Sequence, residues 1–400
     1  MKPPREDLAL RKPATQSSIS QWSRGKTLEA DARGANDGQI SGEQGFHTGY
    51  DLDPFWEVDL ERDYVVERVV LYNRRECAFR LQHFRILKSR DRKRWRTIYA
   101  KRDSSVFGAT KIEPHVADIE DFHVARYVRV QIDGQAWLHF NECQVFGREP
   151  TPKELDGLAE KQAELEASVV DGRDGYFAPV GNLEVFVDRK RYSPKMLNAI
   201  QSDFYEVRER NLVRNLVRPG DRVLEIGTAI GAVAMTAAAI VGGENVLTFD
   251  ANPAMVEDAR KNFLWNGLAA IKAQNGVLTN RNGFVAGKRA SFGISADFWA
   301  SRLGATSAEP DIVEVREIPI SCLEDEVRAH GANVLICDIE GGEVPLLTNA
   351  DLSSFRLLIV ETHAWLAGEA ATDAMVRALV LSGFNVDLVN TGQQMLVMRR

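Results

Sequence analysis

A nine-residue stretch near the middle of the chain constrains the fold more than any other. Val223–Gly231 begins with apolar residues, continues with the carboxylate of Glu225, and contains two glycines, Gly227 and Gly231, before an alanine-rich run. This pattern predicts a buried strand, a tight turn and the start of a helix, which together form nucleotide-type sites at the carboxyl end of a sheet. Glycines let the backbone approach a ligand closely, and Glu225 can accept hydrogen bonds from its polar groups.

Predicted strands and helices alternate through residues 181–400. Residues 245–250 form the strand after the alanine-rich run and end in Asp250, 25 residues after Glu225. An acid at that position can accept hydrogen bonds from both ribose hydroxyls of an adenosine ligand. The next strand ends at Asn275, which either bonds a base edge or forms a plain turn. The alternation predicts a doubly wound, Rossmann-like α/β domain.

The glycine turn lacks the residues that bind phosphate groups. A mononucleotide loop would require Gly-Lys-Ser/Thr after the turn, and the first lysine beyond it is Lys261. The Gly-x-Gly-x-x-Gly pattern of dinucleotide sites is also absent from the turn. These features favour an adenosine ligand without phosphates, namely S-adenosylmethionine.

The order of motifs in this half resembles that of class I S-adenosylmethionine-dependent methyltransferases, and specifically the FkbM-type family. The matching segments are Glu225–Gly231, Phe249–Pro253, Asn262–Gly267, Cys337–Glu343 and Val360–His363. The most specific is the Asp-x-Glu-Gly-x-Glu pattern that begins at Asp338, whereas Ala229 stands where the family usually has Asn.

This resemblance implies transfer of a methyl group to a hydroxyl oxygen, often on a sugar or a polyketide-type natural product. It also implies S-adenosylmethionine as the cofactor. The expected cofactor contacts are Glu225, Gly227, Gly231, Asp250, Asn275 and Asp338.

A sugar hydroxyl is a poor nucleophile, so a general base should assist the transfer. His330 fits the C-terminal cap of a helix. His363 lies just beyond the carboxyl end of a predicted buried strand and is the preferred base, although it could instead orient Glu361. Asp338 is the alternative, either as base or as the ligand of a divalent metal such as Mg²⁺, because some related sugar methyltransferases require a metal. Between the strand that ends at Asn275 and the strand that leads to Asp338, residues 293–308 resemble a lid on the acceptor side.

Residues 1–148 have a different pattern. Alternating and apolar segments recur with turn residues between them, and no long helical period intervenes, which predicts an all-β sandwich or jelly roll. The predicted strands are Phe55–Leu60, Val65–Tyr72, Phe84–Leu87, Trp95–Ala100, Tyr127–Ile132 and Cys143–Phe146.

Short motifs in this region resemble the discoidin / coagulation-factor C-domain superfamily, and within it the fucolectin branch. The motifs are Ala14–Ser18, Asn36–Gly38, Phe46–Thr48, Pro54–Leu60, Tyr72–Glu76 and Leu138–Glu142. The resemblance covers nearly the whole region and implies a jelly-roll module that binds carbohydrate. The superfamily also carries a structural calcium ion held mainly by carbonyl oxygens, and Asp37 and Glu142 match its side-chain ligands.

Fucolectins bind sugar through a histidine, an Arg-x-Asp motif and a further basic residue. Here 26 residues separate His47 from Arg74, Glu76 stands where the family has Asp, and Arg80 arrives one residue early. Guanidinium and imidazole groups can donate hydrogen bonds to vicinal sugar hydroxyls. The resemblance thus implies a fucose-like glycan at His47, Arg74 and Arg80; the other interpretation is surface charge on a retained scaffold.

Residues 149–180 are predicted to form a connector. Thr151 and Glu154 have the form of a capping box with proline at the first helical position, and apolar residues then recur on one helical face. The helix can pack on a domain or on a second subunit, which would make the protein a homo-oligomer. Residues 181–400 then form the methyltransferase-like domain.

Composition excludes several classes of function. The formal net charge is −7, and residues 1–150 contain 25 Lys and Arg against 23 Asp and Glu, so general nucleic-acid binding is disfavoured. No segment has the length and apolarity of a membrane span, and residues 1–5 lack an apolar signal region. The four cysteines show neither metal-type nor disulfide-type spacing. A cytoplasmic location is expected.

The leading hypothesis is an S-adenosylmethionine-dependent O-methyltransferase that modifies a sugar or glycan hydroxyl, with residues 1–148 holding the glycan. Two alternatives stay open. The acceptor could be a small natural product, with the β-domain serving in assembly. The chain could also be a lectin-like binding protein whose methyltransferase half is inactive.

Overall fold

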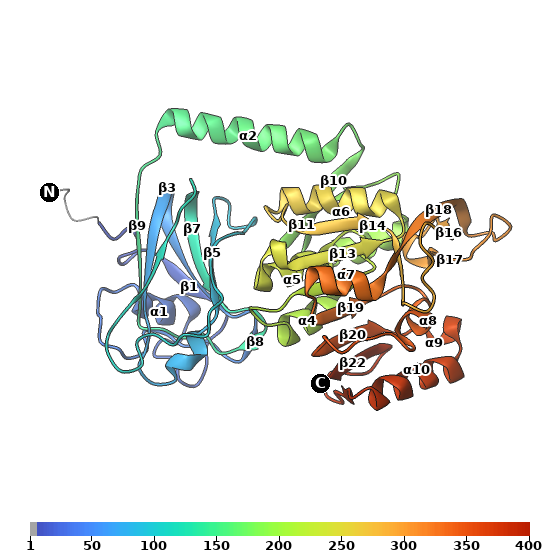
Figure 1. Ribbon diagram of the computed structural model, residues 1–400. Coiled ribbons are helices and arrows are strands. Elements are labelled where there is room, and N and C mark those ends of the chain that lie inside the picture. Colours follow the sequence, from blue (N-terminus) through green and yellow to red (C-terminus); the bar gives the residue numbers. More distant parts are fainter. Residues whose placement is uncertain (1–5) are drawn as a thin grey trace. The chain divides into compact units, whose positions relative to one another are not determined.

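The protein, described here from a computed structural model, divides into two compact units, Met1–Glu164 and Leu165–Arg400. The structure describes residues 6–400, apart from the side chain of Trp299; residues 1–5, where the signal region was judged absent, lie outside the described residues. The division falls within helix α2 (Pro152–Val170), inside the predicted connector (Figure 1). Its capping box forms as predicted, because the Thr151 N–H donates to Glu154 Oε2 (2.8 Å) and the Glu154 N–H donates to Thr151 Oγ1 (3.3 Å).

The first unit is an antiparallel β-sandwich, with a short helix α1 (Leu28–Ala32) in the loops at one end. Its strands are β1 (Ala14–Gln16), β2 (Asp51–Leu52), β3 (Phe55–Tyr72), β4 (Phe84–Ser89), β5 (Arg96–Lys101), β6 (His115–Asp118), β7 (Val124–Gln131), β8 (Gln135–Ala136) and β9 (Glu142–Arg148).

The long strand β3 organises this sandwich. Its pairing with β7 shifts register between Asp59 and Tyr64, where Glu61 has a φ of +69°. The first half of β3 pairs with β1 and β7, and the second half pairs with β6 and β9. The two strands predicted over residues 55–72 are therefore one bent strand, and β6 was not predicted.

An aromatic cluster fills the core of the first unit. Phe46, Trp56 and Phe140 are fully buried, with ring centroids 4.6 to 6.5 Å apart. The indole N–H of Trp56 donates to the carbonyl of Ala32 (2.8 Å), which ties the core to the end of α1. Such burial is the main stabilising contribution for a domain of this size.

The second unit is built on a seven-stranded sheet with the order β14-β13-β12-β19-β20-β22-β21. The first five strands in that order are parallel, and β22 is antiparallel to both of its neighbours. The strands are β12 (Val223–Ile226), β13 (Val246–Asp250), β14 (Lys272–Asn275), β19 (Val334–Cys337), β20 (Leu357–Glu361), β21 (Asn385–Val386) and β22 (Met395–Arg399).

Helices cover both faces of this sheet, because successive residues of each buried strand point to opposite sides. Val223 and Val334 pack in one core with α4, α5 and α6, whereas Leu224 and Leu335 pack in the other with α7, α8 and α10. The helices are α4 (Val207–Leu216), α5 (Ala232–Val241), α6 (Pro253–Trp265), α7 (Leu323–His330), α8 (Glu343–Leu347) and α10 (Glu369–Leu381). The predicted doubly wound arrangement of strands and helices is observed (Figure 1).

Two further pieces complete the second unit. A hairpin of β10 (Gly175–Val180) and β11 (Leu183–Asp188) precedes helix α3 (Pro194–Gln201), and β10 lies where the sequence predicted connector. A small sheet with the order β15-β18-β16-β17 follows β14, and it contains the predicted lid; its strands are β15 (Val277–Thr279), β16 (Arg289–Ser295), β17 (Arg302–Leu303) and β18 (Ile312–Cys322).

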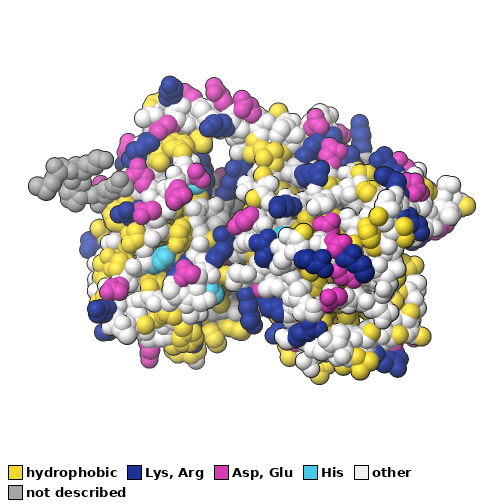
Figure 2. All heavy atoms as spheres, in the orientation of Figure 1, with side chains coloured by type: hydrophobic (Ala, Val, Ile, Leu, Met, Phe, Trp, Pro, Cys, Tyr) yellow, Lys and Arg dark blue, Asp and Glu magenta, His cyan; other side chains and the backbone are white. Residues whose placement is uncertain are grey.

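The surface charge and the lengths of the helices concern two classes of partner, nucleic acids and membranes. Basic and acidic side chains are intermixed over the face seen in Figure 2. Over residues 6–400, no helix is both long enough and apolar enough to cross a membrane.

Candidate functional site

The second unit contains a cavity of about 750 Å³ at the carboxyl ends of its parallel strands. Its wall includes Ile226 and Gly227 at the end of β12, Asp250 of β13, Asp338 after β19 and Glu361 of β20. These four strands are adjacent in the sheet, so residues far apart in the sequence meet at one edge. Open α/β sheets bind their ligands at this position.

The two glycines of the turn have different tasks. Gly227 has a φ of +99°, and a Cβ there would lie 1.9 Å from the carbonyl oxygen of Asp338. Gly231 has a φ of +85°, and a Cβ there would lie 2.4 Å from the ring of Phe263 on α6. Gly227 therefore lets the turn approach the end of β19 on the cavity wall. Gly231 instead serves the packing of α5 on α6 and is not among the described residues that line the cavity.

Asp250 lies on the cavity wall and is held by the turn. Its Oδ2 accepts a hydrogen bond from the Ala229 N–H (2.8 Å), and its Oδ1 accepts from the Asn252 N–H (2.7 Å). Burial raises the pKa of Asp250 to about 6, in spite of these hydrogen bonds. Ala229 has a φ of +45°, a left-handed conformation that the usual Asn of the family tolerates better than Ala does.

Glu225 and Asn275 lie beside the cavity and are not among the described lining residues. Glu225 is buried, accepts a hydrogen bond from Thr248 Oγ1, and has a pKa that burial raises to about 8. Strand alternation places it on the same face as Val223, under helix α5, so it supports the turn from below. The amide of Asn275 donates to the carbonyls of Asp250 (2.9 Å) and Ala251 (3.0 Å), which joins the ends of β13 and β14.

Several carboxyl groups lie on the cavity wall. The acidic lining residues are Glu206, Glu209, Asp250, Asp338, Glu340 and Glu361. Burial is the main cause that raises the pKa of Asp338 well above its usual range, and the nearby carboxylates of Glu361 and Glu206 raise it further. Arg302 also lines the cavity, but its guanidinium pairs with Glu309 and Asp311. The wall thus offers carboxyl groups whose raised pKa a cationic ligand would lower, so the cavity favours a cation and disfavours a phosphate.

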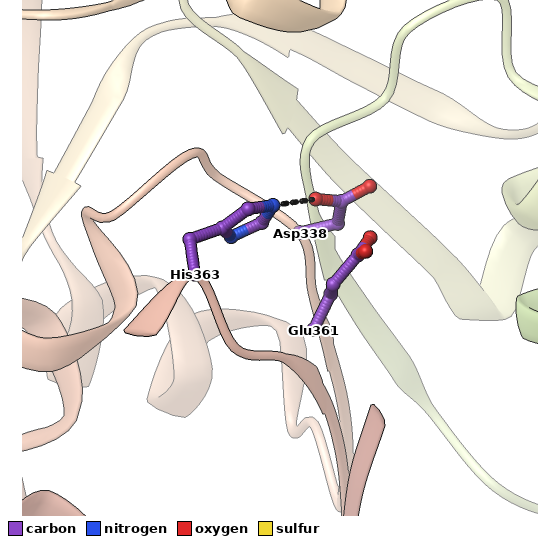
Figure 3. Close-up of side chains that lie close together, drawn as sticks. All are labelled: Asp338, Glu361 and His363. Atoms are coloured by element: carbon purple, nitrogen blue, oxygen red, sulfur yellow. Dashed lines mark ion pairs between the residues drawn. The ribbon is translucent and has the colours of Figure 1, made fainter. Parts of the chain in front are cut away.

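His363 points toward the acidic cluster at the end of β19 and β20 (Figure 3). Its Nδ1 lies 2.7 Å from Oε1 of the fully buried Glu343, and its Nε2 lies 3.8 Å from Asp338 Oδ1 and 3.6 Å from Glu340 Oε2. Burial alone would lower the pKa of His363, but the hydrogen bond to Glu343 and the charges of Glu340, Glu343 and Asp338 raise it to about 9.

The sequence analysis singled out neither Glu206 nor Glu343. Residues 194–216 form two helices, α3 and α4, and Glu206 takes a left-handed conformation (φ +46°) where α4 begins. This break turns Glu206 into the cavity wall, where its Oε2 is buried without a hydrogen-bond partner among the described residues. No local signal in the sequence marks such a break. Glu343 belongs to the Asp-x-Glu-Gly-x-Glu pattern, which was its signal.

The other predicted residues of this unit are placed as follows. His330 is buried outside the cavity and its Nε2 lies 3.1 Å from the carbonyl of Asn245, at a helix end closed by Gly331 with a φ of +73°. From the predicted lid, Phe298 and Leu303 line the cavity, while the side chain of Trp299 lies outside the described residues.

The first unit brings together His47, Arg74 and Arg80. Burial lowers the pKa of His47, and the charges of both arginines lower it further. Arg74 donates a hydrogen bond to Glu76 Oε2 (3.1 Å), which orients its guanidinium. Two aromatic residues that the sequence analysis did not include flank the group: Trp22 lies 5.2 Å from the ring of His47, and Arg80 sits 4.6 Å above Trp137.

Asp37 and Glu142 lie in the same unit, and their surroundings fit a cation. Glu142 is fully buried; its Oε1 accepts from the Gly38 N–H (2.9 Å), and its Oε2 has no hydrogen-bond partner among the described residues. Burial raises the pKa of Glu142 to about 8, and the charge of Asp37 contributes. Asn36 Oδ1 is likewise buried without a described partner. Hard, oxygen-rich groups of this kind suit calcium.

These observations define a two-domain protein: a β-sandwich with a polar and aromatic surface group, and an α/β unit with an acidic cavity at the carboxyl ends of its strands. Residues 13–143 match the F5/8 type C domain, and residues 225–385 match the methyltransferase FkbM domain. The chain therefore combines an F5/8 type C domain with a methyltransferase FkbM domain, which confirms both resemblances found in the sequence.

Solved structures similar to this chain match its first part. A fucose-binding module of Streptococcus pneumoniae is 26% identical, with 37% of this chain and 99% of that chain covered and a TM-score of 0.30. A fucolectin from Morone saxatilis (striped bass) serum is 25% identical, with 37% and 51% covered and a TM-score of 0.33. A chitosan-binding module from a Paenibacillus sp. IK-5 chitosanase/glucanase is 24% identical, with 36% and 99% covered and a TM-score of 0.27. No curated protein matches the chain.

Proposed function

We propose that this protein is an S-adenosylmethionine-dependent O-methyltransferase that methylates a hydroxyl of a sugar or glycan, and that its F5/8 type C domain binds the glycan. The supporting observation is the acidic cavity at the carboxyl ends of the strands in a methyltransferase FkbM domain. S-adenosylmethionine carries a sulfonium and an ammonium group and no phosphate, so its charge complements this wall. We accordingly assign the sheet of this unit to the Rossmann-like class.

Each end of the cofactor has complementary groups in the cavity. Asp250 would accept hydrogen bonds from the ribose hydroxyls, and the backbone of the turn at Gly227 would lie against the ligand. We assign the cofactor ammonium to Glu206, because its buried Oε2 lacks a described partner and lies on the same wall as Asp338. Glu225 and Asn275 would act indirectly, by holding the turn and the end of β13.

Methyl transfer is an in-line displacement, in which the acceptor oxygen forms a bond to the methyl carbon as the bond from that carbon to sulfur breaks. Alignment of the reacting atoms can contribute roughly 7–11 kcal/mol, and a general base roughly 10²–10⁴-fold. His363 is the proposed base, since its Nε2 faces the cavity and Glu343 fixes the ring. A pKa of about 9 makes His363 protonated at neutral pH, so it accepts a proton only at alkaline pH or when its surroundings change. Asp338 is the second candidate.

Titration with S-adenosylhomocysteine tests the enzymatic half of this proposal. We expect the full chain to bind it, with Asp250→Asn weakening the affinity at least about 10-fold, since a hydrogen bond to a charged group contributes about 1.5–3 kcal/mol. Absence of binding to the folded wild-type protein would refute the proposal and favour the lectin-like alternative.

A glycan array tests the other half. The full chain should bind fucose-like glycans, and Arg74→Gln should abolish the signal while leaving S-adenosylhomocysteine affinity unchanged.

A specific observation favours a second candidate, a small natural product as acceptor: Phe204, Leu303 and Leu366 line the cavity with 73%, 45% and 41% of their surface exposed. Methyl transfer to an apolar alcohol together with an empty array would support that candidate.

A further inference from the structure

Three ligating atoms converge at the acidic end of the cavity. One atom each from Asp338, Glu361 and His363 lies within 4.8 Å of the other two. They come from the ends of two adjacent strands, β19 and β20, so the sheet itself fixes their spacing (Figure 3). Atoms that share one octahedral or tetrahedral ion at about 2.1 Å lie within roughly 4.2 Å of each other, so small side-chain rotations bring these three into range.

A second observation comes from the ring of His363. The side chain of His363 is only 6% exposed. Its Nε2 is aimed at Asp338 and Glu340 but, at 3.8 and 3.6 Å, forms no hydrogen bond with a described residue. A buried imidazole nitrogen that faces two carboxylates beyond hydrogen-bonding distance has the geometry of a metal ligand.

Glu343 supplies the support that a ligating histidine needs. Its Oε1 accepts from the backbone N–H of His363 (2.7 Å) and from Nδ1–H of the same ring (2.7 Å), and its side chain is fully buried. In the neutral ring this contact fixes the tautomer in which Nε2 carries the lone pair and fixes the direction of that lone pair, and a bound cation would take the place of the proton that the ring carries at neutral pH. Ligating histidines commonly have a carboxylate in this position.

We infer that Asp338, Glu361 and His363 bind a divalent transition-metal cation, of the Mn²⁺ type, with Glu343 as the positioning residue. Mixed nitrogen and carboxylate ligands favour Mn²⁺ over Mg²⁺ and Ca²⁺, which prefer oxygen alone. The role of the cation rests on the proposed function: the cation would coordinate the acceptor hydroxyl and lower the pKa of that hydroxyl. His363 would then act as a ligand, and Asp338 or Glu340 would receive the proton.

The test is a titration of the metal-stripped full chain with MnCl₂ alone, followed by the electron paramagnetic resonance signal of free Mn²⁺. The candidate cation site at Asp37 and Glu142 of the first unit could also bind Mn²⁺. Every protein that is titrated therefore carries Glu142→Gln, and this single variant is the reference. We expect one site in this reference. His363→Ala and Asp338→Asn, which alter different strands, should each abolish it, and Glu343→Gln should weaken it roughly 10–100-fold. Glu209→Gln, a cavity carboxylate outside the cluster, is the matched control and should change the affinity less than about twofold.

Circular dichroism of each variant establishes that it is folded before it is titrated. An unchanged Mn²⁺ affinity in both folded variants, or no Mn²⁺ binding to the reference protein at millimolar concentration, would overturn the inference. Mg²⁺ binding that is indifferent to His363→Ala would do the same. The titration contains no methyl donor, so S-adenosylhomocysteine binding without Mn²⁺ binding would leave the proposed function standing and remove only the metal.

Discussion

Replacing Gly227 with alanine should deform the cavity at its centre. The residue has a φ of +99°, and the added Cβ would lie 1.9 Å from the carbonyl oxygen of Asp338 and 3.0 Å from its carbonyl carbon. An unstrained contact needs a separation of about 3.5 Å, so the turn and the end of β19 must move apart by roughly 1.5 Å. The Asp338 N–H donates to the carbonyl of Ile226 (2.9 Å), so this hydrogen bond between the two strand ends is strained as well.

The size of the effect follows from two contributions. A left-handed conformation costs about 1–2 kcal/mol for alanine, and the displaced strand end adds to this destabilisation. We expect the melting temperature of the second unit to fall by more than about 4 °C, given about 2–4 °C per kcal/mol for a unit of this length. The affinity for S-adenosylhomocysteine should fall at least about 10-fold, because both moving segments line the cavity.

Gly267→Ala is the matched control. Gly267 follows α6 with a φ of +72°, and a Cβ there would meet nothing within 4 Å. This variant pays the conformational penalty of about 1 kcal/mol without a clash, and its ligand affinity should equal that of the wild type. Calorimetric titration and differential scanning calorimetry measure both quantities. If the two variants lose the same affinity, the close approach of the turn to β19 is not what shapes the cavity.

Three further predictions concern other buried groups. Glu206→Gln should weaken S-adenosylhomocysteine binding about 10-fold in calorimetry, yet raise the melting temperature of the unliganded protein, because it removes a buried carboxylate oxygen without a described partner. Between pH 8 and pH 5, His139 should contribute a loss of about 2 kcal/mol to the free energy of unfolding of the first unit, measured by urea unfolding as the difference between the wild type and His139→Leu, because burial and the nearby charges of Arg74, His47 and Arg80 lower the pKa of His139 to about 2. Calcium at a hundredfold excess over Kd should stabilise the first unit by about 2.7 kcal/mol and so raise its melting temperature, and Glu142→Gln should abolish this response.

The sign of the pH effect comes from proton binding. Unfolded His139 titrates near pH 6.5 and the folded side chain near 2, so the folded state binds fewer protons between these values. The stabilisation is complete above about pH 6.5 and is lost as the pH falls. His139→Leu should lack this contribution, and a pH profile that is the same in this variant as in the wild type would assign the effect elsewhere. For Glu206→Gln, a simultaneous loss of stability and affinity would indicate a structural role. For calcium, an equal response of the wild type and Glu142→Gln would exclude the predicted site.

Local pattern was enough to predict the class of each unit. A parallel strand buried on both faces is mostly apolar, and a sandwich strand tends to alternate, so the strand at Val223–Ile226 and the strands of the first unit could be assigned from the sequence pattern. The Asp-x-Glu-Gly-x-Glu pattern after an apolar strand likewise marked the end of β19 as a site. Acids at the carboxyl ends of parallel strands meet at one edge in any doubly wound sheet, which is why Asp250 and Asp338 could be assigned to one site from the sequence.

Contacts across the structure decided the rest. Pattern did not reveal that Glu225 lies beneath α5, that Asn275 joins two strand ends, or that Gly231 serves α6, because each depends on which neighbour packs against the residue. The break between α3 and α4, which places Glu206 on the cavity wall, also has no signal in the sequence, because the spacing of apolar residues continues through the break. For the glycine turn between β12 and α5, the sequence by itself determined that a strand, two glycines and a helix follow one another. Only the tertiary structure made Gly227 part of the cavity, because the carbonyl of Asp338, more than a hundred residues away in the chain, occupies the space that a side chain would need.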